Sequence, residues 1–249
     1  MVKMLILVNG GVFLAQLVAG DALQVPFRLD TAHPFQLWRY VTYMFLHSPA
    51  NVFHLLFNMF ALWMFGSDME DYFGGRQFLR YYFFTGAGAG LTVAVLDLAT
   101  GQRSMVIGAS GAVFGILLAF GVVYAERVIT LLLFFVFPVS MKAKHFVIII
   151  GAIEFFYGIS PGSSGVAHFA HLGGAAFGLL YLKTPVGRVS FGRKGLLKDL
   201  QDRVHTARSA RDDQRMDDLL RKVNDKGIQS LTEEEKQFLH RMSRSKKWH

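Results

Sequence analysis

The residues best suited to chemistry centre on a serine at the start of a long apolar stretch. Ser110 stands between Gly108-Ala109 and Gly111, and the stretch from Ser104 to Tyr124 has no charge and is long enough to cross a bilayer. A serine hydroxyl becomes an effective nucleophile when a neighbouring base takes its proton, and neutral imidazole suits that task near neutral pH. The chain has no cysteine, which excludes thiolate nucleophiles, disulfides and cysteine metal sites.

The spacing of glycines predicts which histidine can serve as that base. Small residues at four-residue spacing let transmembrane helices approach closely, and such pairs follow both Ser110 and His171. The glycines in question are Gly111, Gly115, Gly174 and Gly178. His168 lacks this spacing, so the sequence favours His171 and predicts that it lies within hydrogen-bonding distance of Ser110.

A second pair of polar residues could stabilise negative charge. His54 and Asn58 are four residues apart and share one face of a predicted helix. Their side chains, together with the free backbone N–H groups where a helix begins near Ser110, could donate to the oxyanion of a tetrahedral intermediate. No Asp or Glu is evident to orient His171, which predicts a Ser-His dyad rather than a triad.

The elements that must position these residues are six apolar segments, which predict an all-α membrane protein. Apolar residues make up 52% of the chain and the mean hydropathy is +0.34. The predicted transmembrane helices are Met4–Gly20, Val52–Phe65, Phe78–Leu96, Met105–Tyr124, Phe146–Ile159 and Val166–Leu182. Several are shorter than the roughly 20 residues of a lipid-facing span, so we expect these to lie inside the bundle.

The apolar run Val128–Val139 is interpreted differently. It is too short to cross a bilayer and Pro138 stands near its end. We therefore expect it at the membrane interface, followed by a cytosolic turn over residues 140–144.

The basic residues predict the orientation in the membrane. With six transmembrane helices, most of the basic loop residues and the basic C-terminal tail lie on the same side of the membrane. These loop residues are Arg76, Arg80, Arg127, Lys142 and Lys144. Positive charge favours the cytosolic side, so both termini are predicted to be cytosolic. The even-numbered helices then run inward, and the site around Ser110 is expected to open to the outer side. If the first segment is instead a signal peptide, the following loop still lies outside.

The C-terminal tail differs in composition from the rest. Of the net charge of +8, +7 lies after Leu182. Beside a membrane domain this indicates attraction to anionic lipid headgroups rather than nucleic-acid binding. We expect a transmembrane domain over 1–183, a basic linker over 184–211 and a small cytosolic helical hairpin over 212–249, with a capping box from Thr232 to Glu235.

Several motifs together resemble the rhomboid family of intramembrane serine proteases. They are Trp38-Arg39, the sequence HLLFN over residues 54–58, Glu70 with Gly74, the sequence GASG over residues 108–111, and AHFAHLGGAAFG over residues 167–178. The resemblance covers about residues 1–183, in order along the chain. It implies a six-transmembrane-helix rhomboid bundle with a small C-terminal helical tail.

The resemblance also implies roles for individual residues. Ser110 would be the nucleophile and His171 the general base, with His54, Asn58 and the Ser110 backbone forming the oxyanion hole. Substrates would be transmembrane helices that unwind near small residues, in the inner membrane of a bacterial cell. No cofactor and no metal ion is implied.

Other polar and aromatic residues are expected to have supporting roles. Trp38 and Arg39 are interpreted as anchors of the first loop, and Glu70 as a local cap or ion-pair partner. Glu154 is expected to face water near the outer end of the fifth helix. Phe114, where some rhomboid proteases have a tyrosine, would stack on the catalytic histidine.

The sequence favours three alternatives less. A catalytically silent rhomboid-like protein would bind transmembrane clients without cutting them, but this chain keeps both dyad residues. A metal-dependent protein would use His47, His54, His168 and His171, but the sequence has no H-E-x-x-H motif and no convincing carboxylate ligand. The nucleophile elbow of α/β-hydrolases, G-x-S-x-G, is excluded because its fifth position is Ala112 here.

Overall fold

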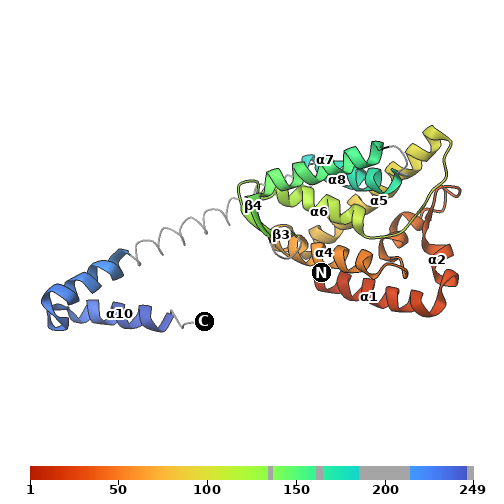
Figure 1. Ribbon diagram of the computed structural model, residues 1–249. Helices are drawn as coiled ribbons and strands as arrows, with labels where there is room; N and C mark the ends of the chain where they lie inside the picture. The colour runs from red at the N-terminus through yellow and green to blue at the C-terminus, as the bar shows by residue number, and fades with distance from the viewer. Residues whose placement is uncertain (134–136, 161–164, 185–213, 246–249) are drawn as a thin grey trace. The chain divides into compact units, whose positions relative to one another are not determined.

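The computed structural model describes residues 1–133, 137–160, 165–184 and 214–245 (Figure 1). The chain divides into two compact units, Met1–Gly192 and Arg193–His249. All of the residues singled out above as candidates for catalysis lie in the first unit.

Six long helices dominate the described part of the first unit and confirm the predicted all-α membrane bundle. They are α1 (Val2–Ala19), α4 (Val52–Phe73), α5 (Gly75–Thr100), α6 (Ser110–Val123), α7 (Ala143–Ile159) and α8 (Val166–Lys183). By length and composition α1, α4 and α5 could each span a membrane. The helix α4 ends later than predicted, at Phe73, and the φ of 80° at the following Gly74 favours glycine and lets α5 begin directly afterwards.

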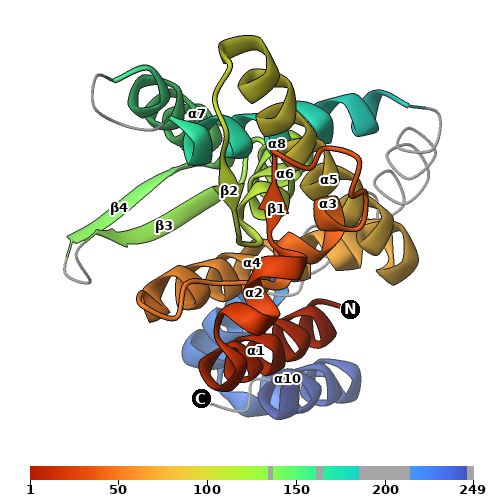
Figure 2. The ribbon, with the colours of Figure 1, turned by 90° about the vertical axis from the view of Figure 1, so that its right-hand side faces the viewer.

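The shortest of these helices, α6, lies inside the bundle, although the segment predicted for it, Met105–Tyr124, is long enough to cross a bilayer. It packs against α4, α5, α7 and α8 (Figure 2). Most of its 14 residues are buried, including Ala112, Ile116 and Phe120. A helix covered by protein does not need to match the thickness of the bilayer.

The predicted start of this helix was wrong. Met105–Val106 forms a short strand, β2, which pairs antiparallel with β1 (Leu29–Asp30) in the first loop. The helix begins only at Ser110, because Gly108 has a φ of 122° that no helix accommodates. The backbone N–H of Gly108 donates to the carbonyl of Tyr43, which attaches this turn to the first loop.

The predicted close contact between α6 and α8 is present, and it is Gly174 and Gly178 of α8 that make it possible. A Cβ on Gly174 would lie 1.9 Å from the carbonyl oxygen of Gly111, and one on Gly178 would lie 3.3 Å from the Cα of Gly115. The backbones of the two helices are therefore in direct contact. Gly111 and Gly115 face a different helix, α5. A Cβ at either glycine would meet residues of α5, so their lack of side chains lets α5 pack closely on α6.

The first loop is folded and is held by the two predicted anchors. It contains α2 (Asp21–Phe27), α3 (Arg39–Thr42) and a 3-10 turn, η1 (Tyr43–Phe45). Buried Arg39 donates from Nη1 to the carbonyls of Val25 and Arg28 at 2.8 and 2.7 Å. The exposed indole of Trp38 donates to the carbonyl of Pro26. Both side chains thus join the two helical parts of the loop.

Glu70 does not act locally. It lies inside α4 rather than after it, and its carboxylate pairs with the ammonium group of Met1 and accepts from the N–H of Val2 at 2.8 Å. These groups are the free donors at the start of α1, where negative charge is favourable. Glu70 therefore caps a different helix, which the order of residues along the chain does not indicate.

The run after α6 forms a β-hairpin. Strands β3 (Val128–Leu133) and β4 (Phe137–Lys142) pair antiparallel, and α7 begins at Ala143, so the turn predicted over residues 140–144 was wrong. The β-branched residues of β3 favour a strand. Glu126, before the hairpin, pairs with Lys142 at 2.6 Å and with Lys144, and both ammonium groups lower the pKa of Glu126 to about 2. The interfacial position of the hairpin stays a prediction.

The described part of the second unit is helical. A helix over residues 214–226 is followed by a 3-10 turn, η2 (Ile228–Ser230), and by α10 (Glu233–Ser245). The capping box is present, since the N–H of Thr232 donates to Glu235 at 2.8 Å and the N–H of Glu235 to Thr232 Oγ1 at 3.3 Å. Leu219, Leu231 and Phe238 form a small core. The predicted linker lies almost entirely outside the described residues.

The contact between α6 and α8 predicts opposite effects for two glycine substitutions. Gly174→Ala would press a methyl group against the backbone of Gly111, which cannot move aside cheaply, and we expect a loss of stability of about 1–3 kcal/mol. Gly151→Ala is the control, because a Cβ there meets nothing within 4 Å. It should stabilise α7 slightly through helix propensity. Thermal unfolding in detergent, followed by intrinsic tryptophan fluorescence, measures both, and equal stability of the two variants would contradict the backbone contact.

Candidate active site

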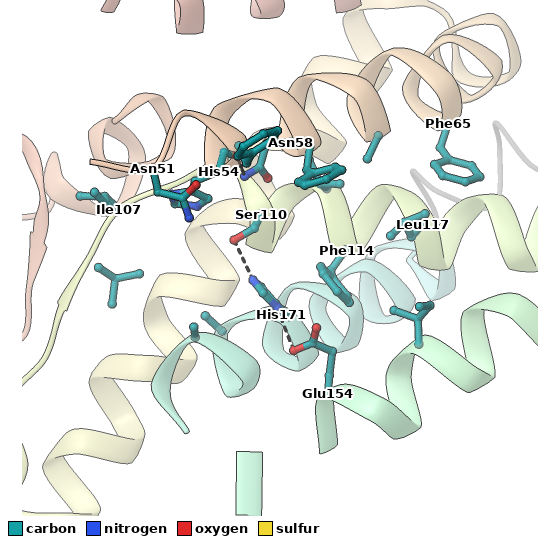
Figure 3. A pocket seen from close by; sticks show the side chains of 18 of the residues that line it. Asn51, His54, Asn58, Phe65, Ile107, Ser110, Phe114, Leu117, Glu154 and His171 are labelled. Atoms are coloured by element: carbon teal, nitrogen blue, oxygen red, sulfur yellow. Dashed lines mark hydrogen bonds and ion pairs between the residues drawn. The ribbon is translucent and has the colours of Figure 1, made fainter. Parts of the chain in front are cut away.

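The predicted contact between serine and histidine is present. Ser110 Oγ, at the first residue of α6, lies 2.8 Å from His171 Nε2 on α8 (Figure 3). The contact between Gly111, directly after Ser110, and Gly174, one turn after His171, holds the two helices at this distance. Both side chains are partly buried, so an imidazole nitrogen is held beside the hydroxyl group without full exclusion of solvent.

A carboxylate completes the arrangement, and the prediction of a dyad without an acidic partner was wrong. Glu154 Oε2, on α7, lies 2.9 Å from His171 Nδ1. Its side chain is only 15% exposed, so it does not simply face water. A carboxylate accepts a hydrogen bond from the N–H at Nδ1, and this tautomer leaves Nε2 unprotonated and able to take the proton of Ser110. The geometry is that of a Ser-His-Glu triad.

The sequence did contain a signal for this carboxylate. A charged residue inside a transmembrane helix is a functional candidate by default. What the sequence did not show is which helix faces α7, because Glu154 and His171 are brought together by the packing of α7 on α8.

The imidazole of His171 is also fixed from the side. The ring of Phe114 stacks on it with a centroid distance of 4.3 Å and an interplanar angle of 3°. This confirms the predicted stacking. Because the two rings are nearly parallel, rotation of the His171 ring out of its plane would break its contact with Phe114. Glu154, Phe114 and Ser110 thus restrain three different parts of one imidazole.

His168 occupies a separate position on the same carboxylate. Its Nδ1 lies 2.7 Å from Glu154 Oε2, and its ring stacks on Tyr157 at 5.6 Å. Of the two neighbouring histidines, His171 is the one whose described hydrogen bonds include Ser110. The preference for His171 over His168 therefore agrees with the geometry.

The predicted oxyanion donors lie on the other side of the serine. Asn58 Nδ2 donates to the carbonyl of His54 at 2.7 Å, and the amide has a second N–H that can point to a substrate (Figure 3). His54 packs on the glycine turn, since a Cβ on Gly108 would lie 2.8 Å from His54 Nε2. The N–H of Ser110 belongs to the first turn of α6, where backbone donors have no partner within the helix.

His47 supports this turn from the protein interior. It is fully buried, and its Nε2 accepts a long hydrogen bond of 3.5 Å from the N–H of Ala109. Burial lowers the pKa of His47 to about 4, so the ring is neutral and can accept. Gln16 of α1 holds the His47 backbone through two hydrogen bonds of 3.0 Å. His47 therefore has a structural role.

All of the candidate catalytic residues border one cavity of about 660 Å³. The polar residues are Ser110, His171, Glu154, His54, Asn58 and Asn51, whereas the remaining wall is largely aromatic and aliphatic. Among the apolar side chains are Phe57, Phe114 and Phe146, from α4, α6 and α7. A cavity of this kind suits an apolar chain segment that places one polar bond at the serine.

The helices and their composition define a polytopic α-helical membrane protein. Comparison with protein families matches residues 34–187 to the Rhomboid domain. The chain belongs to the rhomboid family. A second match, over residues 199–245, is to a family of unknown function.

Several curated proteins are similar to part of this chain. The mitochondrial presenilin-associated rhomboid-like protein of Bos taurus is 32% identical over 137 residues, which are 54% of this chain and 35% of that protein. RHOMBOID-like protein 1 of Arabidopsis thaliana is 34% identical over 148 residues, 59% of this chain and 34% of that protein. The mitochondrial RHOMBOID-like protein 6 of Arabidopsis thaliana is 32% identical over 141 residues, 57% and 41% respectively. The matched region is thus well under half of each relative.

The contact between Glu154 and His171 predicts an effect on the reactivity of Ser110. Glu154→Gln removes the negative charge that stabilises a protonated His171 and can favour the wrong tautomer. We expect labelling of Ser110 by a fluorophosphonate probe to slow by about 10- to 100-fold. This is less than the full contribution of a general base, because His171 itself is still present.

The matched control is Glu126→Gln, which changes a carboxylate that pairs with Lys142 and Lys144 instead. Its labelling rate should equal that of the unmodified protein. An unchanged rate in Glu154→Gln, with unchanged thermal stability, would show that Ser110 and His171 act as a dyad.

Proposed function

We propose that this rhomboid-family protein is an intramembrane serine protease that hydrolyses peptide bonds in or near the transmembrane helices of other membrane proteins. The observation that carries the proposal is the distance of 2.8 Å between Ser110 Oγ and His171 Nε2, with Glu154 on the far side of the imidazole. This arrangement supports Ser110 as a nucleophile activated by a neighbouring base, as in a serine hydrolase.

The reaction follows from these positions. His171 Nε2 takes the proton of Ser110 as Oγ attacks the carbonyl carbon of the substrate, and the same proton then goes to the leaving amine as the peptide C–N bond breaks. An acyl-enzyme remains on Ser110. Water, deprotonated by His171, attacks the acyl carbon and releases the carboxyl product, and the proton returns to Ser110.

The negative charge on the substrate oxygen requires donors that are in place beforehand. The Ser110 N–H, the second N–H of Asn58 and the ring of His54 lie on one side of the cavity and supply them. Such donors act more strongly where water is limited, so they account for a large share of the rate. We therefore assign these three groups to the oxyanion hole.

The apolar walls of the cavity support a transmembrane segment as substrate. A helix must unwind before its peptide bonds reach a serine, and small residues make that unwinding easier. We propose membrane lipids as the other partners and no nucleic acid. The proposed domains are the protease over 1–183, a basic linker over 184–211 and a helical hairpin over 212–249.

We also propose an orientation in which both termini are cytosolic and the site opens to the outer side of a bacterial inner membrane. Ser110 begins α6, whereas the basic residues Arg127, Lys142 and Lys144 follow its other end. Because basic residues favour the cytosolic side, the serine would face outward. The catalytically silent alternative is less well supported, since the hydrogen bonds that would activate Ser110 are formed.

Removal of the nucleophile or the base is the direct test. Purified protein is expected to cleave a single-span membrane protein with small residues in the outer half of its helix. Ser110→Ala and His171→Ala should each lower cleavage below detection, because neither variant can form the acyl-enzyme at a useful rate. Gel-based detection of products measures this, with thermal unfolding as a check of the fold. Full activity in Ser110→Ala, lost on addition of a chelator, would refute the serine mechanism.

The oxyanion assignment makes a separate prediction for Asn58. Asn58→Ala should reduce kcat by about 10²- to 10³-fold with little change in KM, because the lost donor acts mainly on the transition state. Asn224→Ala, an exposed asparagine of the second unit, is the control and should leave both constants unchanged. A rise in KM at constant kcat would instead assign Asn58 to substrate binding.

A further inference from the structure

One feature of the site is not explained by catalysis: two histidines share one carboxylate oxygen. His168 and His171 place their Nδ1 atoms 2.7 and 2.9 Å from Glu154 Oε2. The proposed reaction uses only the second of these contacts. The three possible ligand atoms lie within 4.8 Å of one another, on helices that pack together.

We propose that Glu154, His168 and His171 form a binding site for a divalent transition metal ion, with Zn²⁺ as the ion of best fit, and that the bound ion switches off Ser110. Binding of the ion is independent of the proposed protease function, whereas the inhibition rests on it.

The donor set and its spacing fit Zn²⁺. Two imidazole nitrogens and one carboxylate oxygen are a common set of three protein ligands for this ion, which takes water as its fourth. Bonds of about 2.0–2.2 Å in tetrahedral geometry separate the donor atoms by roughly 3.3 Å. The observed contacts are shorter by about half an ångström, so small side-chain rotations open the space for the ion.

The three side chains are accessible to an ion and are already oriented. Their exposed fractions are 15% for Glu154, 29% for His168 and 17% for His171. Stacking on Tyr157 and on Phe114 holds the two imidazole rings. Ordered ligands lose little conformational entropy on binding, which favours a site that is formed before the ion arrives.

The place of the ion decides whether it helps or blocks the reaction. It would bind Nδ1 of His171, whereas Ser110 Oγ contacts Nε2 on the other side of the ring. A neutral imidazole that binds a metal at Nδ1 carries its one proton on Nε2. That nitrogen can then donate to Ser110 but cannot take its proton. The ion would therefore inhibit, by holding His171 in the wrong tautomer and by occupying Glu154.

The binding half of the proposal is tested without any protease assay. Tag-free full-length Ser110→Ala protein in detergent is titrated with Co²⁺, whose visible absorption reports tetrahedral coordination, and Zn²⁺ is then added to displace it. We expect a spectrum that Zn²⁺ abolishes. Adding His168→Asn or His168→Phe to Ser110→Ala should weaken Co²⁺ binding at least about tenfold. Loss of a residue that only hydrogen-bonds to a metal ligand already lowers metal affinity by about this factor, and loss of a ligand itself should lower it at least as much.

The inhibition half uses protein with Ser110 intact. Zn²⁺ should reduce cleavage and fluorophosphonate labelling, and EDTA should restore both. Because His168 contacts Glu154, the activity of His168→Asn and of His168→Phe without added metal is the reference for each variant, and half-inhibition should need at least about tenfold more Zn²⁺ than in the unmodified protein. His168→Phe can retain the stacking on Tyr157 and guards against a change in local packing.

The outcomes separate the two proposals. Equal Co²⁺ binding with and without His168 would overturn the site, and a bound ion that leaves labelling of Ser110 unchanged would overturn the switch. If no sample cleaves a membrane substrate but the Co²⁺ titration depends on His168, the metal site stands and the protease function fails.

Discussion

The contact between the backbones of α6 and α8 is the constraint on which the rest of the site depends. Gly174 lies against the carbonyl of Gly111, and Gly178 lies against Gly115. At this separation the two helix backbones are in van der Waals contact. In a membrane such packing, rather than the hydrophobic effect, holds helices together. Because Ser110 and His171 stand on these two helices next to the contact, their hydrogen bond is a direct result of it.

A second requirement is that polar groups in a bundle of this kind satisfy one another. Glu154 accepts from two imidazoles, Asn58 donates to the backbone of its own helix, and His47 lies between Gln16 and the turn before Ser110. An unpaired polar group is costly where water is scarce, so these bonds limit each side chain to few orientations. The reacting groups are thereby held in place before a substrate arrives.

Features with a local or periodic signal could be predicted from the sequence. Hydropathy indicated the helices, the spacing of glycines indicated that Ser110 and His171 meet, and the i, i+4 spacing placed His54 and Asn58 on one face. Features that depend on which segments become neighbours could not. Glu154 reaches His171 only because α7 packs on α8, Glu70 caps a helix distant in sequence, and α6 begins at Ser110 because of the backbone at Gly108.

The helix α5 behind the serine has a consequence for how this chain can vary in evolution. A Cβ on Gly115 would lie 2.5 Å from the Cβ of Thr85, and one on Gly111 would lie 2.4 Å from that of Ala89. The volume available at each pair is therefore shared between two helices. A larger residue at one position can be tolerated only with a smaller one at the other, so substitutions at Thr85 and Gly115 are expected to arise together among related chains rather than independently.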